Sequence, residues 1–197
     1  MNVLGIYGSP RKGGNTDLLL DRVLDGAASA GGELSRIYVR DMVFSGCVEC
    51  GGCDETGVCI VRDDMQEAYL KLVESRVIFL ASPVFFLGPS SQTKAFIDRA
   101  QALWRRRMIT KTASERKRRA GGAGYLVMAA ATLGPEQFRG SELTVKYFFD
   151  ALDMSYNGAA FFKAEQKGSI LESPEELDRA YEFGKSAVAA LTAEEGG

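Results

Sequence analysis

The sequence has 197 residues, of which 46% are hydrophobic and 25% charged, and this length and composition are typical of one soluble domain. Its formal net charge is -2, so no overall electrostatic field attracts nucleic acid. It contains no histidine, which excludes His bases, His metal ligands and Ser–His or Cys–His nucleophile pairs, so any chemistry should belong to a cofactor. No basic N-terminal region precedes an apolar segment, and no apolar run approaches the roughly 20 residues that cross a bilayer, so we expect a cytoplasmic protein without a membrane partner.

The first strand-like segment and the loop after it predict a phosphate site. Residues 3–7 are apolar without alternation, as expected of a parallel strand that is covered on both faces. Residues 8–16, the phosphate loop, then supply hydroxyls, a guanidinium and glycines where an amphipathic helix should begin, and helix N-termini present unpaired N–H groups. The candidate phosphate-binding residues are Ser9, Arg11, Gly14, Asn15 and Thr16.

Two better-known glycine patterns do not match this loop. Gly8 and Gly13 have the spacing of a nucleotide triphosphate loop, but Gly14 and Asn15 follow where that loop needs Lys and then Ser or Thr. The dinucleotide pattern G-x-G-x-x-G is also absent. A single terminal phosphate, held mostly by neutral donors, therefore fits best, and a simple turn with Thr16 as the helix cap is the alternative.

Further strands and helices are expected to alternate along the chain. The expected strands are at 34–39, 77–81, 124–130 and 154–160, and the expected helices are at 65–73, 95–104, about 136–153 and after Ser173. Ser90 or Ser91 is expected to cap the second of these helices. The first of these expected strands, at 34–39, has only a weak pattern of apolar residues.

Alternating strands and helices with short loops imply βαβ crossovers, and hence an α/β fold with a parallel sheet between two helical layers. Five strands favour the flavodoxin-like, doubly wound arrangement with strand order 2-1-3-4-5, in one domain spanning residues 1–197. In that order, the ligand crevice lies between the carboxyl ends of the first and third strands. The loops that follow these ends are at 8–15 and 83–88.

The second of these loops suits a flavin ring, which needs flat apolar walls and close backbone donors. Proline fixes one dihedral angle there, the phenylalanines provide rings, and glycine lets the backbone approach closely. The candidate residues are Pro83, Val84, Phe85, Phe86 and Gly88, with Thr132 and Gly134 after the next strand. The alternative is that one of the two phenylalanines is an ordinary core residue.

Four motifs carry a family resemblance: GSPRKGGNT at 8–16, DDM at 63–65, SPVFF at 82–86 and KAFIDR at 94–99. Together they resemble the NADPH-dependent FMN reductase family over roughly residues 1–160. The resemblance implies FMN with its phosphate on Ser9, Arg11, Asn15 and Thr16 and its ring against residues 83–88. It also implies a homodimer or homotetramer with active sites near the subunit interface.

All four cysteines lie in one segment, residues 46–62, called here the cysteine loop. Cys47, Cys50, Cys53 and Cys59 have the spacing C-x2-C-x2-C-x5-C, and the segment has no strand or helix period. Disulfides are possible in principle but do not suit a cytoplasmic protein. Zinc sites usually use two separated C-x2-C pairs, whereas overlapping C-x2-C-x2-C wraps supply corners of iron-sulfur clusters. We therefore expect a four-iron four-sulfur cluster, with zinc or a vacant loop as alternatives. This spacing also resembles the cysteine motif of the iron-sulfur flavoprotein branch of the same family.

Residues 105–120 form a basic excursion, with eight Lys or Arg residues and one acid between Arg105 and Arg119. A solvated loop, a subunit contact, a clamp for the extra phosphate of NADPH and a nucleic-acid patch are all conceivable. The net charge and the single Trp disfavour nucleic acid, because no stacking platform is present.

These features together predict a redox enzyme in which NAD(P)H or ferredoxin is the donor, FMN converts two-electron to one-electron transfer, and the cluster receives or supplies single electrons. The acceptor is expected to be a small molecule or a protein. One rival is a flavin, quinone or azo reductase whose cysteine loop is only structural. The other is a non-enzymatic electron carrier or redox sensor.

Overall fold

The computed structural model describes residues 1–118, 122–134 and 136–195. Its strands are β1 (Asn2–Tyr7), β2 (Glu33–Tyr38), β3 (Val77–Phe85), β4 (Gly88–Pro89), β5 (Ala123–Ala130) and β6 (Ser155–Lys163). Its helices are α1 (Asn15–Ser29), α2 (Met65–Glu74), α3 (Ser91–Asp98), α4 (Gln101–Thr110), α5 (Arg139–Ala151) and α6 (Pro174–Glu195), with 3-10 turns η1 (Val39–Asp41), η2 (Glu115–Lys117) and η3 (Ser169–Glu172).

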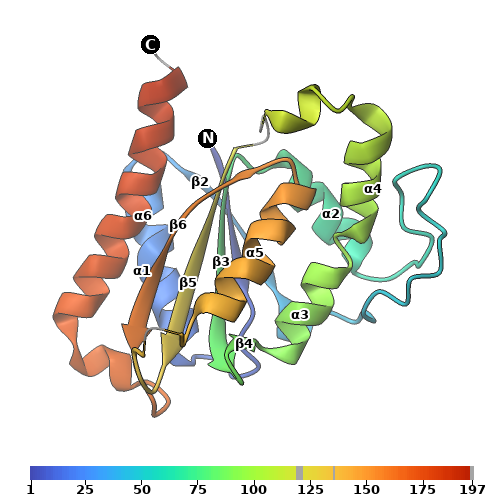
Figure 1. Cartoon of the computed structure of the whole chain (residues 1–197). Helices are drawn as coiled ribbons and strands as arrows, with labels where there is room; N and C mark the ends of the chain where they lie inside the picture. The colour runs from blue at the N-terminus through green and yellow to red at the C-terminus, as the bar shows by residue number, and fades with distance from the viewer. Residues whose placement is uncertain (119–121, 135, 196–197) are drawn as a thin grey trace.

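Five strands form a parallel sheet in the order β2-β1-β3-β5-β6 (Figure 1). Counting the parallel strands alone, this is the predicted order 2-1-3-4-5. The sequence did not predict β4, a two-residue strand that pairs antiparallel with the end of β3. The carboxyl ends of the parallel strands lie together at the lower edge of Figure 1, which is the predicted place of the crevice.

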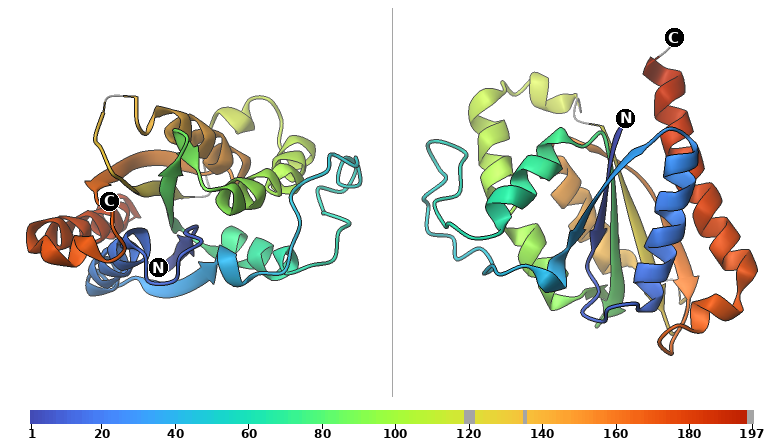
Figure 2. Two further views of the ribbon diagram at one scale, coloured as in Figure 1. Left: turned by 90° about the horizontal axis from the view of Figure 1, so that it is seen from below. Right: turned by 180° about the vertical axis from the view of Figure 1, so that it is seen from behind.

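Helices cover both faces of the sheet, as predicted: α1 and α6 on one face, and α2 to α5 on the other (Figures 1 and 2). Alternate residues of β1 explain this, since Leu4 and Ile6 pack into one core and Val3 and Tyr7 into the other. All residues of β5 are buried, which accounts for the continuous apolar run in its sequence. The edge strand β2 is only partly buried, so its pattern is weak.

The structure differs from the expected helix limits in two places. The helix expected at 95–104 is two helices, because α3 ends at Asp98 and α4 begins at Gln101. Ser90 caps α3 as predicted, since its hydroxyl accepts from the backbone N–H of Thr93. Thr16 is not a cap: α1 already begins at Asn15, and Thr16 is buried in its first turn.

The prediction that residues 105–120 form an excursion from the fold is wrong for the first six of them. Residues 105–110 belong to α4, and the Arg107 side chain is only 5% exposed, between Asp150 and Asp153 at the end of α5. Such partners lie more than 40 positions away in the sequence, so a local pattern of charges could not show them. Positions 119 and 120 of this segment, and the expected loop residues Gly121 and Pro135, lie outside the described residues.

Within the described ranges, no helix could span a bilayer.

Candidate functional site

A crevice of about 220 Å³ opens at the carboxyl ends of β1, β3 and β5. It is lined by Ser9, Pro10, Arg11, Gly14, Asn15, Thr16, Pro83, Val84, Phe85, Ala129, Ala130, Ala131, Ala164, Glu165 and Lys167. All five candidate phosphate-binding residues are therefore brought together with three of the candidate ring-binding residues. This follows from the parallel topology, in which the strand ends that lie far apart in sequence share one edge.

The phosphate loop is held in one shape by its own hydrogen bonds. The Ser9 hydroxyl accepts from the backbone N–H of Arg11 at 3.1 Å, and the N–H of Gly14 donates to the carbonyl of Arg11 at 3.1 Å. A Cβ on Gly14 would lie 3.1 Å from that carbonyl and 3.3 Å from the Ser9 hydroxyl. A larger residue at this position would therefore crowd the atoms of the loop itself, so the loop keeps this shape with glycine at position 14.

Gly8 anchors the start of the phosphate loop to β3 and α3. Its N–H donates to the carbonyl of Ala81 at 2.8 Å, and its own carbonyl accepts from the hydroxyls of Ser90 and Thr93 at 2.7 and 2.9 Å. A Cβ at this position would lie 2.0 Å from the Thr93 hydroxyl. The glycine is therefore required by the close approach of α3 to the loop.

Asn15 bridges the phosphate loop to a third wall that the sequence analysis missed. Its side-chain amide donates to the carbonyl of Gln166 at 2.8 Å, and its side-chain oxygen accepts from the N–H of Ile170 at 3.4 Å. The segment after β6 thereby places Ala164, Glu165 and Lys167 against the crevice. Lys167, a cation that follows the last parallel strand, was the signal in the sequence that could have revealed this wall. The carboxyl end of that strand lies at the same edge of the sheet as the crevice.

The hairpin of β3 and β4 forms the rim of the crevice. Phe85 is 46% exposed, Phe86 is fully exposed, and Leu87 is 50% exposed. The alternative that one of the two phenylalanines is a core residue is therefore wrong. Phe86 and Leu87 occupy the hairpin turn with φ of +50° and +62°, a conformation that costs most L residues energy and tends to occur at functional sites.

Four of the candidate ring-binding residues do not line the crevice. Phe86 points away from the chain, and Gly88 pairs with Phe85 in the hairpin. Thr132 and Gly134 are exposed in the loop after β5, where the Thr132 hydroxyl donates to the side chain of Gln137 at 3.1 Å. The residues of this strand that do line the crevice lie earlier, at 129–131.

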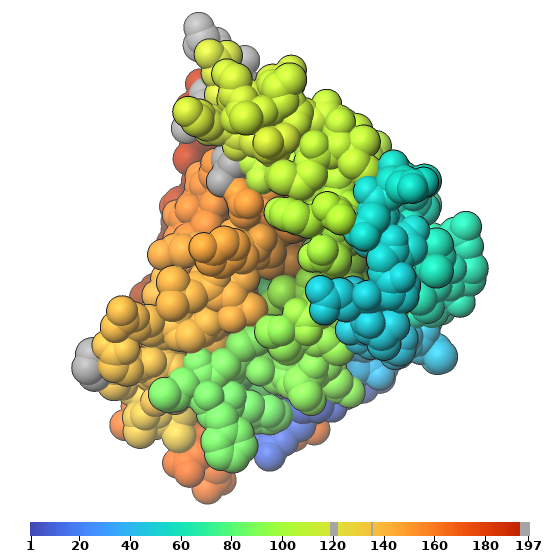
Figure 3. Space-filling view, turned by 45° about the vertical axis from the view of Figure 1, so that its right-hand side comes forward, coloured from blue at the N-terminus to red at the C-terminus, as the bar shows by residue number. Residues whose placement is uncertain are grey.

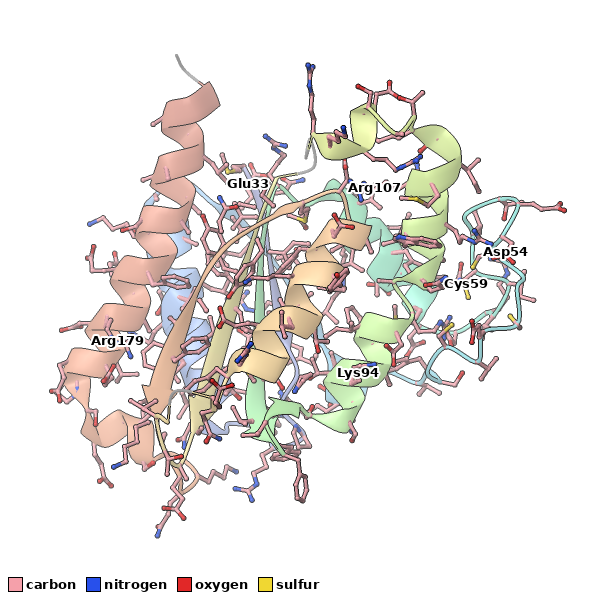
Figure 4. The ribbon with its side chains drawn as sticks, in the orientation of Figure 1. Glu33, Asp54, Cys59, Lys94, Arg107 and Arg179 are labelled. Atoms are coloured by element: carbon pink, nitrogen blue, oxygen red, sulfur yellow. The ribbon has the colours of Figure 1, made fainter. Side chains whose placement is uncertain are left out.

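The cysteine loop projects from the side of the molecule, next to α4 (Figures 1 and 3). Its four cysteines line one cavity of about 380 Å³, together with Arg99, Trp104 and Arg105. Cys47 and Cys50 are exposed, Cys53 and Cys59 are half-buried, and all four are free thiols. Figure 4 shows Cys59 and Asp54 beside α4. An ion pair between Asp54 and Arg105, with 2.6 Å between Oδ1 and Nε, holds the loop to this helix.

Donors are directed at two of the sulfur atoms. The Arg99 guanidinium donates to Cys59 Sγ at 3.4 Å, and the backbone N–H of Glu49 donates to Cys47 Sγ at 3.5 Å. Burial and the charge of Asp54 raise the pKa of the Cys53 thiol. Among the described residues, no three His, Cys, Asp or Glu side chains are arranged to hold a metal ion. The observation that joins the four thiols is thus the one cavity that they line.

The crevice and the cysteine cavity are separate sites, with no lining residue in common. In Figures 1 and 2, helix α3 lies between the hairpin of β3 and β4 and the cysteine loop. The buried Arg107 is far from the crevice, at the opposite edge of the sheet (Figure 4). Asp150, Asp153 and the carbonyl of Arg116 bind its guanidinium, and Lys111 pairs with Asp153. These contacts do not favour the NADPH clamp considered for this segment.

Known proteins match both the sequence and the fold. The family described as NADPH-dependent FMN reductase matches residues 1–166. The chain belongs to this NADPH-dependent FMN reductase family. Its predicted resemblance to that family is confirmed, over a segment close to the expected 1–160.

Within this reductase family, relatives of the chain are named iron-sulfur flavoproteins. The chain is 40% identical over 99 residues to one from Archaeoglobus fulgidus, a match that covers 50% of this chain and 45% of that protein. It is 30% identical over 150 residues to one from Methanosarcina thermophila, covering 76% of this chain and 72% of that protein. The match to the Archaeoglobus fulgidus relative thus spans about half of that relative's length.

A solved flavodoxin from the domain Archaea shows the same fold as this FMN reductase family member. Its TM-score is 0.56 at 13% identity, over 96% of this chain and 97% of that chain. The predicted flavodoxin-like fold is confirmed by this likeness, which concerns the fold alone.

Proposed function

We propose that the protein is an FMN-dependent oxidoreductase that passes electrons between NAD(P)H or ferredoxin, FMN and a four-iron four-sulfur cluster. The observation that carries this proposal is the pair of sites in one chain of the FMN reductase family: a crevice at the strand ends, and a cavity lined by all four cysteines. The names of the relatives support the same combination.

The residues of the crevice fit FMN. Ser9, Gly14 and Thr16 surround the hollow at the start of α1, and the first N–H groups of a helix have no acceptor within it, so a terminal phosphate suits this place. Arg11 in the phosphate loop and Lys167 in the wall after β6 add positive charge to the same crevice. We assign the phosphate to Ser9, Arg11, Gly14, Asn15 and Thr16.

The flavin ring is assigned to the other half of the crevice. Pro83, Val84 and Phe85 supply the apolar wall there. The exposed ring of Phe86, the backbone at Gly88, and Thr132 and Gly134 stay proposals for contacts at the rim. Bound FMN supplies hydride and single-electron transfer, while the protein side chains bind and orient it and shape access to it.

The cysteine loop fits an iron-sulfur cluster by its donor set. Cys47, Cys50, Cys53 and Cys59 would hold the cluster, because iron-sulfur clusters take thiolate ligands, and the donors on Cys47 and Cys59 are of the kind that tune such sulfurs. The second candidate function is a plain NAD(P)H-dependent flavin, quinone or azo reductase whose loop holds zinc or nothing. This candidate is kept because, among the described residues, no three possible ligands are arranged to hold a metal ion.

Homodimer or homotetramer formation is part of the proposal. Exposed apolar side chains gather near the crevice and along α5, including Phe86, Leu87, Leu143 and Tyr147, and large exposed apolar patches often mark interfaces. Donor and acceptor are proposed only by class: NAD(P)H or ferredoxin on one side, and a small molecule or a protein on the other.

An anaerobic visible spectrum, combined with iron and acid-labile sulfide assays, tests the proposal. Flavin bands together with iron and sulfide in about four equivalents each would support it. Zinc without sulfide, or flavin alone, would point to the plain reductase, and the absence of flavin would overturn FMN binding. Rapid bleaching by NADPH with turnover on a quinone would indicate an enzyme, whereas reduction by ferredoxin without turnover would indicate a carrier.

A further inference from the structure

Asp17 and Arg40 form an ion pair directly behind the phosphate loop. Arg40 Nη1 lies 2.9 Å from Asp17 Oδ2, and the two side chains are only 9% and 6% exposed. Asp17 lies in the first turn of α1, whereas Arg40 lies in η1, after the neighbouring strand β2. The pair therefore joins the phosphate loop to a separate element.

Each partner also holds one end of the loop. Asp17 Oδ2 accepts a hydrogen bond from the backbone N–H of Gly13 at 3.0 Å, and Gly13 has a left-handed φ of +65°. Arg40 Nη1 donates to the carbonyl of Ser9 at 3.4 Å. The two charged groups thus fix the segment from Ser9 to Gly13, on which the shape of the phosphate hollow depends.

The guanidinium itself is held from the other side. It lies over the ring of Tyr38, 5.0 Å from the ring centroid, and the Tyr38 ring packs at a tilt against that of Tyr7, with 4.4 Å between the ring centroids. Arg40 Nε and Asp17 Oδ1 are buried and make no hydrogen bond. A buried ion pair with unsatisfied atoms contributes little net stability, so its more useful effect is to select one loop conformation.

The negative charge of Asp17 and the positive charge of Arg40 have opposite effects on the binding of an anion. An unpaired carboxylate directly behind the loop would repel a phosphate, and Arg40 neutralises it. Burial raises the pKa of Asp17, while the bond from Gly13 and the charge of Arg40 oppose that shift. The ion pair therefore lets a carboxylate orient the loop without repelling the ligand.

We propose that Asp17 and Arg40 are a positioning pair that sets the affinity of the crevice for FMN relative to riboflavin, which lacks the phosphate. The inference rests on the proposed phosphate site. Neither residue contacts the flavin in this proposal, because both act through the backbone of Ser9 and Gly13.

The test is a fluorescence titration of the flavin-free full chain with FMN and, separately, with riboflavin. Arg40→Met should weaken FMN binding about 100-fold, since it leaves the Asp17 charge unpaired behind the loop, and should change riboflavin binding less than about twofold. Asp17→Ala should weaken FMN binding about tenfold. This direction is diagnostic, because a pure charge effect would strengthen FMN binding once the carboxylate is gone.

Two further variants complete the design. Asp25→Asn breaks an exposed ion pair with Arg22 on the same helix, whose side chains are 55% and 36% exposed, and should leave both affinities unchanged. Arg40→Lys keeps the charge but cannot reach both Asp17 and Ser9, so it should weaken FMN binding several-fold. It decides the question if the other two variants do not fold.

Equal losses for FMN and riboflavin, or tighter FMN binding by Asp17→Ala, would overturn the positioning role while leaving the phosphate site intact. A wild-type protein with no preference for FMN over riboflavin would overturn the phosphate site itself, and this inference with it.

Discussion

Arg99 and Asp63 form a two-pronged ion pair beneath the cysteine loop, with Nη1–Oδ2 and Nη2–Oδ1 distances of 2.6 and 3.0 Å. The same guanidinium donates to the carbonyl of Ser45 at 2.8 Å and to Cys59 Sγ at 3.4 Å. One arginine, whose side chain is only 2% exposed, therefore connects the entry to the loop, its last cysteine and α2, which starts just after Asp63.

Asp63→Asn should destabilise the protein strongly, because it leaves the buried Arg99 without a counter-charge. We expect a loss of about 3 kcal/mol in the free energy of unfolding, as for other broken buried pairs. Urea unfolding of the flavin-free protein measures it. Asp98→Asn is the matched control, since the Lys94–Asp98 pair on α3 is exposed and should change stability by less than about 0.5 kcal/mol. Equal stability of the two variants would contradict the assignment.

The ion pairs at the end of α5 should make part of the stability depend on acid pH. Burial alone would raise the pKa of Asp153, but the hydrogen bonds and charges of Lys111 and Arg107 together lower it. A carboxyl whose pKa is lowered by folding stabilises the protein above its unfolded value, near 4, and loses that contribution as the pH falls through its folded value.

Asp153→Asn should therefore be less stable than wild type at pH 7, and the difference should shrink below about pH 4. Asparagine tolerates the left-handed φ of +61° at this position, so the substitution changes mainly the charge. Urea unfolding at pH 7, 5 and 3 measures the difference. Glu136→Gln, in an exposed pair with Arg139, should show almost no difference at any pH. A difference for Asp153→Asn that stays constant with pH would contradict the role given to its charge.

Much of the fold could be predicted because β1, β3 and β5 are covered on both faces and read as continuous apolar runs. The phosphate loop was also visible, since its residues are contiguous. The wall at 164–167 was not, because the contacts that place it at the crevice join residues far apart in sequence, such as the bond from Asn15 to Gln166. The β4 hairpin was missed because Phe86 and Leu87 are not residues that usually form tight turns.

That hairpin leads to a third prediction. Two-residue turns with both φ values positive favour Asn and Gly, whereas Phe86 occupies this turn with its side chain fully exposed. Phe86→Asn should therefore stabilise the flavin-free protein by about 1 kcal/mol, because Asn tolerates this conformation and no packing is lost within the chain. Thermal unfolding at low protein concentration measures the change. Phe86→Ala removes the same ring but keeps the strained φ, so a gain of the same size there would show that strain is not the cause.

Helices α1 and α6 pack so closely that each needs a glycine. A Cβ on Gly184 would lie 1.8 Å from the carbonyl oxygen of Val23, and a Cβ on Gly26 would lie 1.9 Å from the carbonyl oxygen of Tyr181. Both contacts involve backbone, which cannot move aside as a flexible side chain could. Gly184→Ala should therefore force the helices apart and reduce the free energy of unfolding by about 3 kcal/mol, despite the better helix propensity of alanine.

Ser186→Ala, on the exposed side of the same helix, isolates the propensity term and should change stability by no more than about 0.5 kcal/mol, in the stabilising direction. Urea unfolding of both variants separates the two effects, because they share a helix and differ only in the space beside the new methyl group. If Gly184→Ala were as stable as Ser186→Ala, the backbone approach of α1 and α6 could not be as close as the structure shows. A loss confined to Gly184→Ala, with an unchanged ratio of FMN to riboflavin affinity, would place this contact in the stability of the fold and outside the crevice.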